Sequence, residues 1–333
     1  MSNAKAFDGR NNPHTVLLGA GASLAALPNG DRYGRKLPLM SNFISVVDGL
    51  EAYLERAGIC CSTGNIETLY ADLAERETQK EHLAAIESII SEYFASLVIP
   101  DELTLYDHLV LSLCPKDMIA TFNWDPFLMQ ALTRVGDRIG FEYLPRFAHL
   151  HGSVAEGYCD DPVHDGKMII GHTRASCDCG NTLKPTPLLY PIRRKDYSGH
   201  PAIRVQWKDL RTSLQNAYLF TIFGYSAPVS DAEAVRLLKD AWGEKSQHPF
   251  DLVEVVDVAD KRTIRKRWEP FMPASEHHFG TRSSWYGTWL ASHPRRSCED
   301  LWSTRMQLQP KAGRPIPRNA SWDELCEWVQ PLL

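Results

Sequence analysis

The chain has 333 residues, of which 44% are hydrophobic and 23% charged, and its formal net charge is −5 at pH 7. This composition is that of an ordinary soluble globular protein, and the net negative charge gives no support for direct nucleic-acid binding. No apolar run approaches the roughly 20 residues of a membrane-spanning helix, so we expect no membrane contact. The eight cysteines are scattered rather than arranged as a disulfide framework, which is typical of the reducing cytoplasm.

The first predicted strand ends in a glycine-rich turn. Val16, Leu17 and Leu18 form a short apolar run, typical of a buried strand in a parallel sheet, and the turn Gly19–Ser23 leads from it into a helical stretch. Glycines let a backbone approach a ligand closely, and a helix N-terminus presents N–H groups to an anion. The turn has no third glycine at Leu24 and no Walker lysine, so by itself it leaves phosphate binding and a packing role equally open.

The stretch between the first and second strands predicts an inserted helical lobe, at about residues 41–113. Apolar residues at helical spacing predict a helix over Ser41–Arg56, which Gly58 ends. The pattern is strongly helical again over Asn65–Ile99, and Leu103–Leu113 predicts one further helix.

The next two predicted strands each end in polar residues. Met118–Thr121 is the second strand, and Asn123 and Asp125 follow it closely. The third strand, Arg146–Leu150, runs directly into His151. Each strand thus brings polar side chains to its carboxyl end.

The second half of the chain repeats the alternation of strand, turn and helix. It begins with an irregular excursion over about residues 154–190, rich in glycine, aspartate, histidine and cysteine, which we expect to lie outside the core. The elements after it are, in order, a helix over Trp207–Leu214, a strand over Tyr218–Phe223, a helix over Ala232–Trp242 and a last strand over Leu252–Val256. The two strands end at Gly224 and Asp257.

This alternation favours an α/β fold with an open parallel sheet flanked by helices. In such sheets, ligands bind outside the carboxyl ends of the strands. Five predicted strand ends carry residues suited to such a crevice, namely Gly19, Asn123, His151, Gly224 and Asp257. Because five turns point to the same edge, the sequence favours a dinucleotide site there.

Four segments together resemble the sirtuin-like superfamily. They read GAGAS, TFNWD, LHGS and GYSAPVSD, and in this order they span roughly Thr15 to Asp257. The chain resembles most the divergent bacterial branch that contains NAD-consuming antiphage effectors. The resemblance implies a Rossmann-like NAD-binding domain over residues 11–270, with NAD as the substrate.

The resemblance implies roles for three residues at the centre of the site. His151 would be the catalytic histidine, and Asn123 and Asp125 would lie beside the nicotinamide ribose. An imidazole with its ordinary pKa of about 6.5 suits a base that deprotonates a ribose hydroxyl or a water at neutral pH. Asn123 would place that hydroxyl or water, and Asp125 would support the motif. Structural roles are the alternative, since a histidine after a strand is most often structural and Asn123 could be a turn residue.

The resemblance also implies which residues hold the rest of the dinucleotide. These are Gly19, Ala20, Gly21 and Ser23 against the phosphates, and Gly224 and Ser226 on the adenosine side. Asp257 ends a strand where a carboxylate can accept the 2′-hydroxyl of the adenine ribose, which favours NAD over NADP. Ser226 could instead serve only the start of the next helix, the role we expect for Asp231.

Two departures from the protein-deacetylating sirtuins weaken a deacetylase interpretation. Those enzymes follow the first motif with an Asp-Phe-Arg segment, and they hold zinc with two Cys-x-x-Cys pairs, neither of which is present here. The side chains available for a metal are Cys159, His164, His172, Cys177 and Cys179. Cys-x-Cys is a poor spacing for a zinc knuckle and the other candidates are widely spread, so we expect no metal, zinc included.

The chain beyond the last predicted strand has two notable segments. Residues 261–267, KRTIRKR, form a basic run that predicts a solvated helix face, with contact to a phosphate or nucleic-acid cofactor as the lesser alternative. Residues 271–333 form a small C-terminal extension rich in aromatic residues, which we expect to pack on the main domain or on another subunit.

We therefore expect an NAD⁺ glycohydrolase that releases nicotinamide and ADP-ribose and acts as a gated antiphage effector in abortive infection. Because unchecked NAD loss kills a cell, a regulatory protein partner, a phage trigger, a nucleotide signal or assembly of a homo-oligomer would gate it. One alternative is a module that senses NAD or ADP-ribose without turnover, which would need neither Asn123 nor His151. The other is a protein deacylase or ADP-ribosyltransferase.

Overall fold

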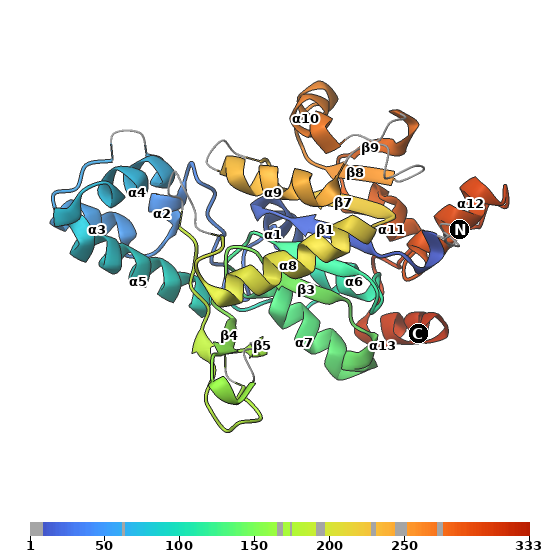
Figure 1. Cartoon of the computed structure of the whole chain (residues 1–333), viewed down its shortest axis with the longest axis horizontal. Coiled ribbons are helices and arrows are strands. Elements are labelled where there is room, and N and C mark those ends of the chain that lie inside the picture. Colours follow the sequence, from blue (N-terminus) through green and yellow to red (C-terminus); the bar gives the residue numbers. More distant parts are fainter. Residues whose placement is uncertain are drawn as a thin grey trace, which may run out of the picture.

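The computed structural model describes residues 9–61, 64–164, 169–173, 175–190, 197–227, 231–243, 252–271 and 276–333. In this part of the chain, six strands form one sheet in the order β3-β2-β1-β7-β8-β9, and all neighbouring strands are parallel (Figure 1). The strands are β1 (His14–Leu18), β2 (Met118–Thr121), β3 (Arg146–His149), β7 (Leu219–Phe223), β8 (Leu252–Val256) and β9 (Phe279–Arg282). This open, Rossmann-like sheet confirms the predicted fold class.

The strand order reverses at β1. From β1 the chain adds β2 and β3 on one side, then returns to add β7, β8 and β9 on the other. The carboxyl ends of β1 and β7 are neighbours, because Leu18 is in register with Phe223. Open α/β sheets bind their ligands at such a reversal, so the topology selects one edge of the molecule for a site.

Each face of the sheet has its own hydrophobic core. Val16 and Leu18 of β1 belong to one core and Leu17 to the other, because alternate residues of a strand point to opposite faces. The first core is covered by α1 (Ala20–Ala26), α6 (Leu105–Leu111), α7 (Phe127–Ile139), α11 (Trp289–Ser292) and α13 (Trp322–Val329). The second is covered by α8 (Pro201–Asn216), α9 (Ala232–Trp242) and α10 (Lys261–Trp268).

The predicted helical lobe extends to one side of the sheet (Figure 1). It consists of α2 (Phe43–Val46), α3 (Leu50–Arg56), α4 (Ile66–Ala74) and α5 (Lys80–Ser96). The single helix expected over Ser41–Arg56 is wrong, because the chain breaks between α2 and α3. Val47 ends α2 in an extended conformation, and Gly49, the N-cap of α3, has a φ of +82°, a left-handed conformation that glycine adopts without strain.

The prediction that Leu252–Val256 is the last strand is also wrong. β9 follows it and pairs with it in parallel, so part of the C-terminal extension completes the sheet. Glu254 of β8 is buried, and its carboxylate lies 2.9 Å from the guanidinium of Arg282 and accepts the backbone N–H of Trp289 at 2.8 Å. α12 (Ser297–Met306) packs against residues of β7 and β8 through Cys298 and Leu301.

The excursion after β3 contains a second, small sheet that the sequence analysis did not anticipate. Its strands, in the antiparallel order β5-β4-β6, are β4 (Glu156–Cys159), β5 (Ile169–His172) and β6 (Lys184–Pro185). Residues 165–168 and 174 of the excursion lie outside the described residues. In the described segments, every helix is too short or too polar to cross a membrane.

Candidate active site

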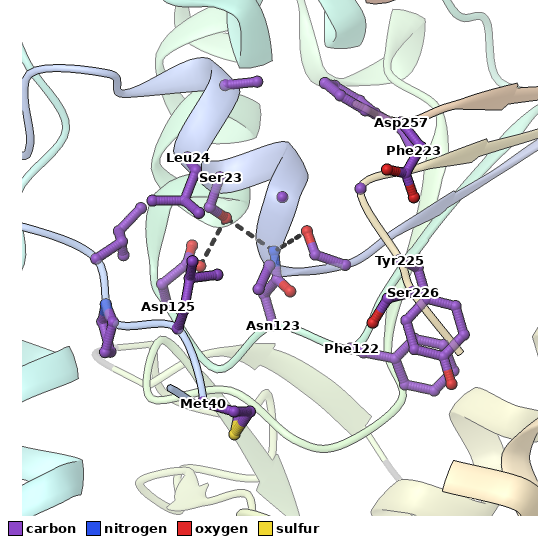
Figure 2. Close-up of a pocket in the computed structure, with 18 of the residues that line it drawn as sticks. Ser23, Leu24, Met40, Phe122, Asn123, Asp125, Phe223, Tyr225, Ser226 and Asp257 are labelled. Atoms are coloured by element: carbon purple, nitrogen blue, oxygen red, sulfur yellow. Dashed lines mark hydrogen bonds between the residues drawn. The ribbon is translucent and has the colours of Figure 1, made fainter. Parts of the chain in front are cut away.

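A cavity of about 790 Å³ lies at the carboxyl edge of the sheet, where the strand order reverses (Figure 2). Its lining includes every position that the sequence analysis assigned to the dinucleotide: Gly19, Ala20, Gly21, Ser23, Asn123, Asp125, His151, Gly224, Ser226 and Asp257. The parallel topology therefore brings the five predicted strand ends together. The volume is within the range of small-molecule and cofactor sites.

The glycine-rich turn packs closely against the turn after β7. The backbone N–H of Gly21 donates to the carbonyl of Gly224 at 2.9 Å, and that of Gly19 donates to the carbonyl of Phe223 at 3.0 Å. A Cβ atom on Gly19 would lie 2.6 Å from the Cα of Tyr225, and one on Gly21 would lie 2.8 Å from the Cα of Gly224. Glycine is therefore required at both positions because the two turns pack so closely against each other.

The N-terminus of α1 is only partly open to an anion. The Gly21 amide is bonded to Gly224, and the Ala22 amide donates to the carbonyl of Gly19 at 2.9 Å. Among the described residues, the amide of Ala20 finds no backbone acceptor, and Ala20 is an exposed part of the cavity lining. A phosphate at this turn would therefore meet one open N–H group rather than several.

Asn123 is fixed beneath the glycine-rich turn by its amide nitrogen. Nδ2 donates to the carbonyl of Gly19 at 3.0 Å and to the hydroxyl of Ser23 at 2.8 Å (Figure 2). The Ser23 hydroxyl donates to Asp125 at 2.7 Å, so the Tyr106 hydroxyl, also 2.7 Å from it, donates to Ser23. Asn123 Oδ1 accepts no hydrogen bond from the residues that the structure describes, which leaves it to accept one from a ligand.

Asp125 is a buried carboxyl next to Asn123. Burial raises its pKa to about 6, although hydrogen bonds from Ser23 and from the backbone N–H of Phe127, at 3.2 Å, favour its charged form. Burial also raises the pKa of Tyr106 well above its usual value, which keeps that hydroxyl protonated. The carboxylate of Asp125 thus accepts its hydrogen bonds from Ser23 and from the backbone of Phe127.

The raised pKa of Asp125 predicts a pH-dependent cost to the folded state. The pKa is about 6 in the folded protein and near 3.8 in the unfolded chain, so the group's contribution to stability is complete below pH 3.8 and is lost as the pH rises through 6. The Asp125→Asn side chain does not titrate. We expect the free energy of unfolding of the wild type, relative to this variant, to fall by about 3 kcal/mol between roughly pH 4 and pH 7. Urea denaturation of both proteins across this pH range measures the difference. Free energies of unfolding that change with pH in the same way in both proteins would contradict the prediction.

His151 follows β3 and is buried among aromatic rings. Its Nε2 lies 3.1 Å from the hydroxyl of Tyr197, and the two rings stack with 19° between their planes. Phe122 also packs on the imidazole, with ring centroids 4.7 Å apart, and stacks in turn on Tyr225 (Figure 2). Tyr197 belongs to no motif and lies 46 residues after His151, so the sequence analysis missed it.

Asp257, at the end of β8, lies in an ion pair. Its carboxylate is 3.0 Å from the guanidinium of Arg267 in α10 and accepts the backbone N–H of Ala259 at 2.8 Å. Arg267 belongs to the basic run over residues 261–267, which the sequence analysis assigned to a solvated face. Any ligand of Asp257 would therefore meet a carboxylate whose charge is partly balanced by that arginine.

Two walls of the cavity come from segments outside the four motifs. One is the segment before and into α2, with Leu37, Pro38, Leu39, Met40 and Phe43. The other is the segment after β9, with Ser283, Ser284, Trp285 and Tyr286. Both lie outside the regular alternation of strand, turn and helix, so spacing could not identify them.

Four side chains of types that can bind a metal lie together in the region of the small antiparallel sheet. The donor atoms of Cys159, His164, Cys177 and Cys179 are all within 4.8 Å of one another. The Sγ atoms of Cys159 and Cys179 are 3.6 Å apart, near the about 3.8 Å expected for two thiolates on one tetrahedral zinc ion. The expectation of no metal is therefore not supported, because folding gathers ligands that are widely spaced in the sequence. Among the described residues, His172 is not part of this group.

This donor set predicts that the purified protein holds about one zinc ion per chain. The double substitution Cys159→Ser/Cys177→Ser is expected to abolish metal binding and to lower the thermal midpoint, since the free energy of metal binding contributes to folding. Elemental analysis after dialysis measures the zinc, with the exposed Cys60 changed to serine as a control. A wild-type protein that contains no zinc, although it was expressed with zinc present, would contradict the prediction.

No protein-family model matches the sequence, and no curated protein matches it either. Solved structures of Sir2 proteins do match at low identity. One, from a study of the mechanism and regulation of Sir2 enzymes, is 13% identical with a TM-score of 0.39, over 97% of this chain and 94% of that chain. A Sir2 homologue in complex with NAD is 14% identical with a TM-score of 0.37, over 96% and 90%. A mutant Sir2 homologue in complex with ADP-ribose is 12% identical with a TM-score of 0.33, over 99% and 97%.

Proposed function

We propose that this protein is an NAD⁺ glycohydrolase that cleaves the nicotinamide–ribose bond and releases nicotinamide and ADP-ribose. The observation that carries the proposal is that Asn123 and His151 line one cavity with the glycine-rich turn, at the reversal point of a parallel sheet. Open parallel sheets bind nucleotides at this point. The resemblance of the four motifs to NAD-consuming sirtuin-like proteins supports NAD as the particular dinucleotide.

The side chains present suit this reaction. Loss of nicotinamide passes through an oxocarbenium-like state, and nicotinamide is already a good leaving group, so orientation and a base are the main requirements. Asn123 Oδ1 accepts a hydrogen bond from a ribose hydroxyl or from the attacking water. His151 removes a proton as the water oxygen bonds to the anomeric carbon. The products are nicotinamide, ADP-ribose and one proton, which leaves through the imidazole.

A second candidate, NAD-dependent protein deacylation, is favoured by one observation. The cluster of Cys159, His164, Cys177 and Cys179 offers a metal site after His151, and the lack of such a site was one of two arguments against this activity. The other argument stands, because the Asp-Phe-Arg segment is missing. ADP-ribosyl transfer would break the same bond with a different acceptor.

We further propose that the enzyme is a gated antiphage effector in the cytoplasm, controlled by a protein partner, a phage trigger or assembly into a homo-oligomer. The resemblance of the four motifs to the bacterial branch supports this proposal. A second support is physiological, since an enzyme that destroys a common cofactor harms its own cell unless it is held inactive.

The test measures nicotinamide and ADP-ribose released from NAD⁺ by the purified chain, with and without an acetyl-lysine peptide. Equimolar products without peptide support the hydrolase, and release that requires the peptide supports the deacylase. Asn123→Ala is expected to lose release while keeping NAD⁺ affinity, and the exposed Asn216→Ala serves as its control. NAD⁺ binding without release is the result expected both of a sensor and of a hydrolase that is held inactive. The absence of both binding and release overturns the dinucleotide site.

A further inference from the structure

A second cavity, of about 530 Å³, forms a groove lined by residues of α8 and α9. The two helices lie side by side on one face of the sheet (Figure 1). The base of the groove is apolar, formed by side chains that the helices bury, such as Leu210 and Leu238. Its rim is basic, because Arg204, Lys208 and Arg211 project from α8 into it. These three positions follow the spacing i, i+4 and i+7, which places them on one face of the helix. The proposed hydrolysis makes no use of them.

Four cations line this groove, namely Arg204, Lys208, Arg211 and Arg236, but only one carboxylate, Glu233, which lies 3.8 Å from Arg236. Arg204 donates to a backbone carbonyl at 3.1 Å, and within the described part of the chain the side chains of Lys208 and Arg211 have no hydrogen bond and no ion pair. A fourth cation at the rim, Arg236, is already paired with Asp240 at 3.2 Å. The whole chain has a net charge of −5, so this excess of cations over carboxylates makes the groove locally positive on a negative protein.

The chemistry of the groove specifies its ligand class. Guanidinium groups bind phosphate oxygens through two parallel hydrogen bonds, and lysine binds phosphate as a point charge. The volume suits a small molecule, and the apolar base suits a group such as a nucleobase. We propose that the α8–α9 groove binds a phosphorylated small molecule of mononucleotide size through Arg204, Lys208 and Arg211, and that this ligand regulates the candidate active site.

Two side chains of the groove touch the segment that carries His151. Tyr197 lines the groove and places its hydroxyl 3.1 Å from His151 Nε2. Trp207 also lines it, and its indole N–H donates to the carbonyl of Leu150 at 3.0 Å. A ligand that draws α8 toward α9 therefore changes both contacts and the orientation of the imidazole. The proposal thus has a binding half, that the groove holds the ligand, and a regulatory half, that the ligand acts on the candidate active site. The regulatory half rests on the proposed hydrolysis, whereas the binding half does not.

The binding half is tested by isothermal titration of the full chain with inorganic pyrophosphate. Lys208→Ala/Arg211→Ala removes two charge-assisted contacts and is expected to weaken binding at the groove about 100-fold. Arg262→Ala/Lys266→Ala removes the same charge from exposed positions of α10 and is expected to leave binding unchanged. Equal isotherms for the two double variants overturn the site. Matching thermal midpoints exclude misfolding as the cause of a difference.

The regulatory half is tested by the imidazole NMR resonance of His151, which is identified by its absence in His151→Ala. Saturating pyrophosphate is expected to shift this resonance in the wild type and to leave it in place in Lys208→Ala/Arg211→Ala. The measurement needs no turnover, so it can succeed even where the proposed hydrolysis fails. A resonance that stays unshifted while calorimetry shows the groove occupied overturns the regulatory link.

Discussion

The His151→Ala variant is expected to release nicotinamide from NAD⁺ about 10²–10⁴-fold more slowly than the wild type, the usual effect of removing a general base. The glycine-rich turn and the network around Asn123 do not depend on this side chain, so the affinity for NAD⁺ is expected to change little. The rate of release and the affinity for NAD⁺ together distinguish a loss of catalysis from a loss of binding. Steady-state rates and calorimetric affinities on the same preparations measure them.

The control for this variant is His277→Ala, which removes an exposed imidazole that is not part of the cavity lining. Its rate is expected to equal that of the wild type. Should His151→Ala keep a third or more of the wild-type rate, the base must be another group, and His151 would have a structural role among its aromatic neighbours. A parallel loss of NAD⁺ affinity would instead identify His151 as a binding residue.

Gly224→Ala is expected to disrupt the candidate active site and to destabilise the fold by more than about 3 kcal/mol. Gly224 has a φ of +64°, and a Cβ atom there would lie 2.2 Å from the backbone nitrogen of Ala22. That nitrogen is part of α1, so it cannot move without breaking the hydrogen bond from Gly21 to Gly224. Urea denaturation and NAD⁺ binding measure the two effects.

Gly34→Ala is the matched control for this substitution. Gly34 has a φ of +79°, but a Cβ atom there would meet nothing within 4 Å. The left-handed backbone alone costs an alanine about 1 kcal/mol, so the difference between the two variants isolates the steric conflict between the turns. Similar stabilities for both would mean that the two turns can separate freely.

Much of the central sheet could be predicted from the sequence, because buried parallel strands are short apolar runs that end at glycine or polar residues. β9 could not, since Phe279–Arg282 contains one large apolar residue and lies at the sheet edge, where burial on both faces is not required. The break between α2 and α3 was missed because apolar residues keep their helical spacing across it, and the spacing does not reveal the conformation of Gly49.

The candidate site was predictable where it consists of strand ends and unpredictable where it depends on tertiary contacts. Asn123 and His151 could be placed at one edge by topology alone. Tyr106 and Tyr197, which hold Ser23 and His151, act through single hydroxyl groups from distant segments, and no local pattern marks them. The cluster around Cys159 was misjudged for the same reason, since a small antiparallel sheet brings its members together.

The place of β9 in the sheet bears on how this protein can be divided. A fragment that ends near residue 270 would leave β8 as an open strand edge of five buried residues, with unpaired N–H and C=O groups facing water. Such an edge is a template for pairing with other chains, so we expect the fragment to aggregate rather than to form a smaller stable domain. Glu254 would lose both of its partners in the same cut. The C-terminal segment therefore protects the sheet against self-association.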